Sequence, residues 1–241
     1  MELLASLRKS PLIATALVLA GLLLIAAGYW GPWVWAEPAG LRVLGLDLAE
    51  YVKFIAEVRS GQVTLVREVF YLPLVALSLS LSLLAHRSEV RFPGVVRWVL
   101  NLLAVPTALA ILPPAWTPAL LLTPEFIKQT VAIGLCMAAA VLSYPVWRRL
   151  PGWLVGAMLV ALALLAASPV MISFMRLRGP LDAIYGKPIE VGRGPVEMVL
   201  GFGMLCAGYL MALGQAETSE SRPQEPALNA LGSSQASASE E

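Results

Sequence analysis

Few side chains in this sequence could carry out acid–base, nucleophilic or metal chemistry. The single histidine, His86, lies beside Arg87 with no second histidine or cysteine nearby, so a metal site there is not expected. Asp47 with Glu50, and Asp182 with Glu190, are the acidic pairs outside the apolar stretches whose spacing suits general acid–base work. The first pair also fits a helix capping box, which explains it without catalysis.

Motifs typical of enzymes are also missing from the sequence. It contains no zinc-binding motif, no phosphate-binding loop and no Gly-x-Ser-x-Gly nucleophile elbow. Cys136 and Cys206 both lie in apolar stretches, which is typical of small buried hydrophobic residues. We therefore expect no enzyme activity and no cofactor. One enzymatic alternative is action on lipid headgroups through Asp182, Glu190 and Arg193.

The composition indicates an integral membrane protein. Of the 241 residues, 58% are hydrophobic and 14% are charged, against roughly 45–50% and about 25% in soluble domains. The 17 basic and 16 acidic side chains give a net charge of +1, which offers no strong field for nucleic acid. The lipid bilayer is therefore the expected partner, with a second membrane protein as a further one and no nucleic acid.

Six apolar stretches come close to the length of about 20 residues that a helix needs to cross a bilayer. We predict an all-α integral membrane protein with six transmembrane helices in residues 12–215, an N-terminus at 1–11 and a disordered tail at 216–241. Pro106 and the pair Pro113 and Pro114 predict that the third helix bends and ends early. The six predicted spans are Leu12–Trp30, Val69–His86, Val95–Trp116, Phe126–Trp147, Trp153–Met175 and Pro195–Gly214.

Basic residues in the short connections predict the orientation in the membrane. Arginines cluster between the second and third spans and between the fourth and fifth. These turns should face the cytoplasm, with both termini on the same side of a plasma (inner) membrane. The first apolar stretch is longer than that of a secretory signal, so we expect it to be retained as an anchor. The arginines in question are Arg87, Arg91, Arg97, Arg148 and Arg149.

The long outer connection, residues 31–68, begins with aromatic residues. Trp33 and Trp35 fit an aromatic belt at headgroup depth, and a platform for stacking a ligand or partner is the alternative. A helix capped by Asp47 should follow, with an apolar face that includes Tyr51, Ile55 and Val58. This amphipathic helix should either cover the ends of the spanning helices or contact a membrane partner. Residues 62–70 alternate loosely and are compatible with a brief strand.

The second outer connection, residues 176–194, is rich in glycine and proline, which predicts a shaped loop without a long helix. Arg178, Lys187 and Arg193 give it a positive excess that suits lipid phosphates or another anionic ligand. Ordinary anchoring of basic side chains at the membrane surface explains the same residues.

Polar and small residues within the spans predict helix packing. Ser78 and Ser82 share one helix face and should bond a neighbouring helix. Small residues also recur four positions apart, a spacing that allows helices to approach closely. The four pairs are Gly134 with Ala138, Gly152 with Gly156, Ala157 with Ala161, and Gly208 with Ala212.

These observations favour a non-catalytic accessory or scaffold subunit of a membrane assembly, contacting its partner through the outer amphipathic helix. The alternative is a small-molecule or lipid transporter that uses the bends near Pro106 and Pro169, together with Asn101, as a gate.

Overall fold

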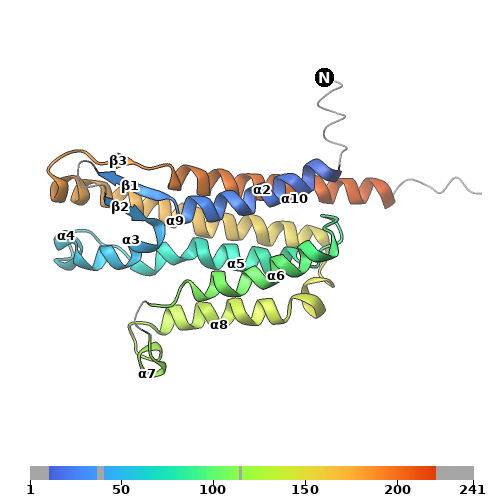
Figure 1. Cartoon of the computed structure of the whole chain (residues 1–241), viewed down its shortest axis with the longest axis horizontal. Coiled ribbons are helices and arrows are strands. Elements are labelled where there is room, and N and C mark those ends of the chain that lie inside the picture. The colour runs from blue at the N-terminus through green and yellow to red at the C-terminus, as the bar shows by residue number, and fades with distance from the viewer. Residues whose placement is uncertain (1–10, 37–40, 114–115, 221–241) are drawn as a thin grey trace, which may run out of the picture.

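The computed structural model describes residues 11–36, 41–113 and 116–220 of the chain. Its helices run alongside one another in an elongated bundle, with a small sheet at one end (Figure 1). The bundle helices are α2 (Pro11–Tyr29), α5 (Leu72–Leu84), α6 (Gly94–Leu109), α8 (Ile127–Val141), α9 (Gly152–Tyr185) and α10 (Gly194–Glu220). Shorter elements are α3 (Gly45–Tyr51), η1 (Val52–Phe54), α4 (Ala56–Arg59), η2 (Arg67–Tyr71), α7 (Pro118–Leu121) and the π-helical turn η3 (Ser143–Trp147).

Four segments of the described chain are long and apolar enough to cross a membrane. They are Pro11–Tyr29, Arg67–Leu84, Gly152–Tyr185 and Gly194–Thr218. The other two predicted spans form shorter helices, α6 with 16 residues and α8 with 15. At 1.5 Å per residue these helices measure roughly 22–24 Å, against about 30 Å of hydrocarbon. Helix α6 ends at Leu109, ahead of Pro113, so the predicted early end of the third helix is confirmed.

Helix α5 lies at the centre of the bundle and packs against α2, α6, α8 and α9. Its alternating leucines and serines suit this position, because Ser78, Ser80 and Ser82 are all buried. The Ser78 hydroxyl donates to the carbonyl oxygen of Ala104 in α6 at 2.8 Å. This confirms the predicted bond to a neighbouring helix for Ser78 and ties α5 to α6 next to Pro106. For Ser82 the prediction is wrong, because its hydroxyl donates to the Ser78 carbonyl oxygen of its own helix at 3.0 Å.

Helices α2 and α10 form an antiparallel pair whose contact is built from small residues. Gly21 and Gly28 on α2 face α10, and Gly201 and Gly208 on α10 face α2. A Cβ on Gly21 would lie 2.6 Å from the Leu205 nitrogen, and one on Gly201 would lie 2.6 Å from the Ile25 nitrogen. The glycines in each helix are seven residues apart, about two turns, so they follow one face and let the backbones meet.

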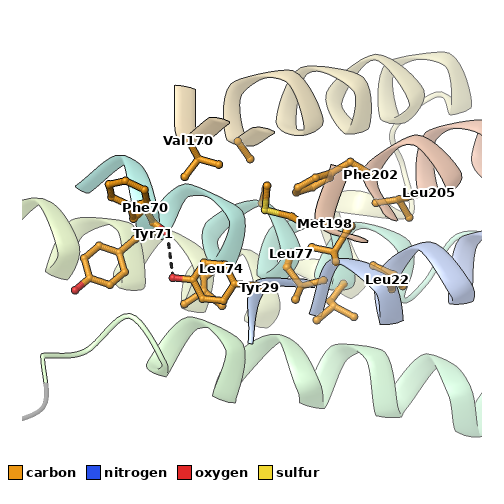
Figure 2. Close-up of a cluster of buried hydrophobic side chains, with 14 of the residues drawn as sticks. Leu22, Tyr29, Phe70, Tyr71, Leu74, Leu77, Val170, Met198, Phe202 and Leu205 are labelled. Carbon is orange, nitrogen blue, oxygen red and sulfur yellow. Dashed lines mark hydrogen bonds between the residues drawn. The ribbon is translucent and has the colours of Figure 1, made fainter. Parts of the chain in front are cut away.

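Large side chains fill the space between this helix pair and α5 (Figure 2). Tyr29, Phe70 and Leu74 are buried there together with Met198 and Phe202. The Tyr29 hydroxyl donates to the Phe70 carbonyl oxygen at 3.0 Å, which gives the buried phenol a partner. This bond ties the end of α2 to the start of the η2–α5 segment.

The two ends of the bundle differ in chemistry. Near the start of α2 and the end of α10 lie the α5–α6 and η3–α9 connections (Figure 1). This is the arginine-rich end, defined by Arg87, Arg91, Arg97, Arg148 and Arg149. The opposite, sheet end carries the strands and the short helices α3, η1 and α4 (Figure 1).

The sheet is a feature that the sequence did not predict. Strand β1 (Pro32–Ala36) pairs antiparallel with β2 (Leu41–Leu44) and with β3 (Glu190–Val191), in the order β2-β1-β3. The expectation that Trp33 is an exposed aromatic anchor is wrong, because its side chain is buried inside the protein. Its Nε1 donates to the Gly28 carbonyl oxygen at 3.0 Å. The suggested strand at 62–70 is also wrong, since residues 67–71 form the helix η2.

The predicted amphipathic helix is divided into α3, η1 and α4. Asp47 does not cap it from outside; it lies inside the first turn of α3 and accepts the Leu44 N–H at 3.1 Å.

In the second outer connection, α9 continues through Pro180 to Tyr185, so the first ten residues of that connection are helical and not a loop. Residues 216–220, predicted as the start of the tail, are helical, since α10 reaches Glu220. Residues 1–10 and 221–241 lie outside the described part of the chain.

Candidate functional site

Four charged side chains meet at the sheet end in what we call the sheet-end cluster: Glu50, Lys53, Arg67 and Glu125. The Lys53 Nζ lies 2.8 Å from Glu50 Oε2 and 3.2 Å from Glu125 Oε1. The Arg67 Nη1 lies 3.2 Å from the same Glu125 oxygen, and its Nη2 donates to the Glu125 carbonyl at 2.7 Å. Both cations also lie over the Phe126 ring, 5.1–5.3 Å from its centroid.

The cluster is electrically balanced and joins three segments that are distant in sequence. It connects the α3–η1 segment, the η2 helix and the residues just before α8. The Tyr71 hydroxyl adds a bond to Glu50 Oε1 at 3.2 Å. Glu50 and Lys53, three residues apart, form the ion pair that helical spacing allows, and the second partner of Lys53 is Glu125. Since each carboxylate is matched by a cation, the arrangement suits a structural clamp better than acid–base chemistry.

The clamp holds the outer amphipathic segment against the bundle. Its apolar side faces inward, because Ile55 is buried and Tyr51 and Val58 are half-buried. The Tyr51 hydroxyl lies 3.4 Å from that of Tyr185 near the end of α9. Trp33 is buried and packs edge-to-face on Phe174, and Trp35 is half-buried in β1. Four of the residues expected to contact a partner, Trp33, Tyr51, Ile55 and Val58, therefore pack on the protein's own core.

The basic residues of the second outer connection lie on different elements. Arg178 belongs to α9, where its buried Nε has no hydrogen-bond partner among the described residues. Arg193 lies 3.4 Å from Glu197 in the first turn of α10, and Lys187 is exposed. The Asp182 carboxylate accepts the Ile189 N–H at 2.7 Å and so shapes the turn after α9.

The three residues predicted to gate a transport path lie in two helices that both pack against α5. Pro106 is exposed on α6, Asn101 lies on the same helix, and Pro169 is half-buried in α9. Helices α6 and α9 both continue through their prolines. The Asn101 Oδ1 is buried without a hydrogen-bond partner in the described residues.

A laterally open apolar groove of about 400 Å³ lies between α8 and α9, with α5 as its floor. We call it the α8–α9 groove. Leu79 and Leu83 of α5 lie at its base, and Trp147 of η3 also lines it. The remaining lining residues belong to the two walls: Leu135, Ala138, Ala139 and Leu142 on one side, and Met158, Ala161, Leu162 and Leu165 on the other.

Two of the four predicted small-residue pairs flank this groove. Ala138 and Ala161 line it, and their partners Gly134 and Ala157 are also exposed. A Cβ added at Gly134 would meet nothing within 4 Å. The two other pairs are used inside the bundle, with Gly152 and Gly156 against α10 and Gly208 against α2.

At the arginine-rich end, a buried arginine ties two connections together. The Arg87 side chain is only 4% exposed and forms an ion pair with Glu89. Its Nη1 donates to the carbonyl oxygens of Trp147 and Leu150 at 2.7 and 2.8 Å. The sequence marked Arg87 as a surface charge and missed its burial, because the acceptors come from backbone about 60 residues away.

Among residues 11–36, 41–113 and 116–220, no group of three or more His, Cys, Asp or Glu side chains is placed to hold a metal ion. Cys136 and Cys206 are free thiols on α8 and α10. Comparisons with protein-family models, curated proteins and solved structures give no match.

Proposed function

We propose that the protein is a non-catalytic accessory or scaffold subunit of a membrane assembly, and that a transmembrane helix of a partner protein docks in the α8–α9 groove. The observation that supports this proposal is that one member of each of two exposed small-residue pairs, Ala138 on one wall and Ala161 on the other, lines the groove. The site differs from the outer helix expected from the sequence, whose apolar side is covered by the bundle.

The physics of helix association in lipid supports this occupant. Lipid tails are as apolar as leucine side chains, so an apolar surface alone does not drive helices together there. Close packing between helices does drive association in lipid, and small residues allow the helices to pack closely. The same chain already uses glycines in this way between α2 and α10. Exposed small residues at Gly134, Ala138, Ala157 and Ala161 would offer a further helix a close approach in the same way.

The proposed topology places six helices across a plasma membrane with the arginine-rich end in the cytoplasm. Four helices have full spanning length, and α6 with α8 would form a shorter hairpin beside α5. A hairpin of this length is accommodated by local thinning of the bilayer or by flanking residues that reach the interface. The excess of arginine in the short connections supports the orientation.

The transport alternative has less support. Pro106 is exposed on the outside of α6, and both proline-containing helices are continuous.

Native gel electrophoresis of mildly solubilised membranes tests the proposal. We expect the wild-type protein to migrate in a complex larger than the monomer, and Ala138→Leu with Ala161→Leu to release it by filling the groove. Ala207→Leu is the matched control, because Ala207 is an exposed alanine on α10 away from the groove. Migration of the wild type as a free monomer would contradict the proposal. So would a complex that the groove-filling variant leaves intact.

A further inference from the structure

A second pocket, of about 320 Å³, lies at the arginine-rich end between the end of α5, the start of α6 and η3. It is lined by His86, Ser88, Arg97, Tyr144 and Arg148. We call it the His86 pocket. The imidazole is held edge-on between two aromatic rings, with centroid distances of 5.3 Å to Tyr144 and 6.1 Å to Trp98.

The pocket has an excess of positive charge. Arg97 donates through Nε to the Phe92 carbonyl at 3.0 Å, and Arg148 donates through Nη1 to the Tyr144 hydroxyl at 3.1 Å. Neither guanidinium forms an ion pair within the described ranges. The nearby carboxylate of Glu89 is already paired with Arg87. Two arginines therefore share a recess without a counter-charge from the protein.

The two arginines affect the protonation of His86. Burial lowers the pKa of His86 below its ordinary value of 6.5, and the charges of Arg97 and Arg148 lower it further. The imidazole is thus neutral at neutral pH, and an anion bound beside it would make the protonated form more favourable. Arg97 reaches the pocket from α6, and Tyr144 and Arg148 reach it from η3. Ser88 lines it from the α5–α6 connection.

We propose that the His86 pocket binds a phosphate group, carried by the headgroup of an anionic lipid. Two guanidiniums and the Tyr144 hydroxyl supply the donors that phosphate oxygens accept, and arginine suits this ligand particularly well. The Ser88 hydroxyl donates to Glu89 Oε2 at 3.4 Å. The pocket lies beside the end of α5 and the start of α6, at an end of the bundle where lipid headgroups contact helices. The neighbouring Trp98 is exposed on the outer face of α6. Basic pockets between helices are a common way to hold anionic headgroups on the cytoplasmic side. The proposal does not depend on the partner helix.

Native mass spectrometry of the full chain, purified in mild detergent with equal amounts of phosphatidylglycerol and phosphatidylcholine, tests this site. The wild type is expected to retain phosphatidylglycerol preferentially. Arg97→Gln and Arg148→Gln should each weaken that retention by about fivefold, the size of one arginine–lipid contact near the surface. Arg149→Gln is the matched control, since Arg149 is exposed at the same end but does not line the pocket. Arg148→Lys should keep most of the preference because it keeps the charge.

Two further measurements identify the ligand. If a lipid headgroup is bound, inorganic phosphate alone neither binds at millimolar concentration nor displaces phosphatidylglycerol. Retention should also increase between about pH 7.5 and about pH 5.5, because the bound anion favours protonated His86, and His86→Gln should remove this change. Equal retention of the two lipids, or equal losses in Arg148→Gln and Arg149→Gln, would overturn the site. Arginine-dependent displacement by inorganic phosphate would overturn its assignment to a lipid.

Discussion

Gly21 of α2 lies so close to Leu205 of α10 that a Cβ on the glycine would come 2.6 Å from the leucine backbone nitrogen. A backbone nitrogen cannot move aside in the way that the end of a flexible side chain can. The antiparallel α2–α10 pair therefore depends on the absence of a side chain at this position.

Replacing Gly21 by alanine should destabilise the protein by about 1–3 kcal/mol, since overpacking at a close contact forces the two helices apart. Gly203→Ala is the control, because a Cβ at Gly203 on the same helix pair meets nothing within 4 Å. That variant should be neutral or slightly stabilising, as alanine favours helix more than glycine does. Thermal unfolding in detergent compares the two, and equal melting temperatures would contradict the packing described.

Arg87→Met should reduce the free energy of unfolding by about 3–5 kcal/mol, the usual cost of leaving one member of a buried ion pair alone. The substitution also leaves the carbonyls of Trp147 and Leu150 without their donor. Adding Glu89→Leu should recover part of the loss, because it removes the unpaired carboxylate. Arg149→Met, at an exposed position, should change the stability little. Denaturant titration of the wild type and the three variants measures these free energies of unfolding. An Arg87→Met protein as stable as the wild type would contradict the anchoring role of Arg87.

Arg67 of the sheet-end cluster should contribute more to stability than Lys128, a cation outside the cluster. Arg67 has a side chain only 13% exposed and bonds both a carboxylate oxygen and the backbone of Glu125. Arg67→Gln should therefore cost about 1–2 kcal/mol. Lys128→Gln should cost close to nothing, since Lys128 is 67% exposed and lies 3.5 Å from Glu68. Proteolysis rates at the outer segment would report the difference, and comparable effects from the two variants would argue against a clamp.

Stability should also depend on pH through His86. Its pKa is lowered in the folded protein, so the unfolded chain binds the proton more readily. The contribution of this group is fully present above its ordinary pKa of 6.5 and is lost as the pH falls below that value. In lipid-free nonionic detergent, the melting temperature of the wild type should decrease more on acidification than that of His86→Gln. Parallel pH profiles for the two proteins would be inconsistent with the lowered pKa.

The sequence predicted the features that depend on local length and composition. The positions of α2 and α5 and the starts of α6, α8, α9 and α10 follow from apolar stretches and prolines, and the early end of α6 follows from Pro113. The Glu50–Lys53 pair follows from helical spacing. These features need only neighbours in the chain, so one sequence is sufficient to find them.

What the sequence did not predict depends on contacts between distant segments. Strand β1 is completed by β3, which lies about 150 residues later, so Trp33 resembled a surface aromatic until its partner was placed. Gly179 and Pro180 resembled a loop, although α9 tolerates both. The four small-residue pairs look alike in the sequence. Only the fold separates Gly208, packed on α2, from Gly134, which faces open space.

Site-specific photo-cross-linking in native membranes tests the central claim, that the α8–α9 groove receives a partner helix, most directly. A photoreactive residue at Leu135 or Leu165, on the two walls of the groove, should form an adduct with one other membrane protein. The same residue at Leu23, exposed on α2 away from the groove, should label lipid only. Lipid adducts at all three positions would contradict the account, and so would adducts only with a second copy of this chain.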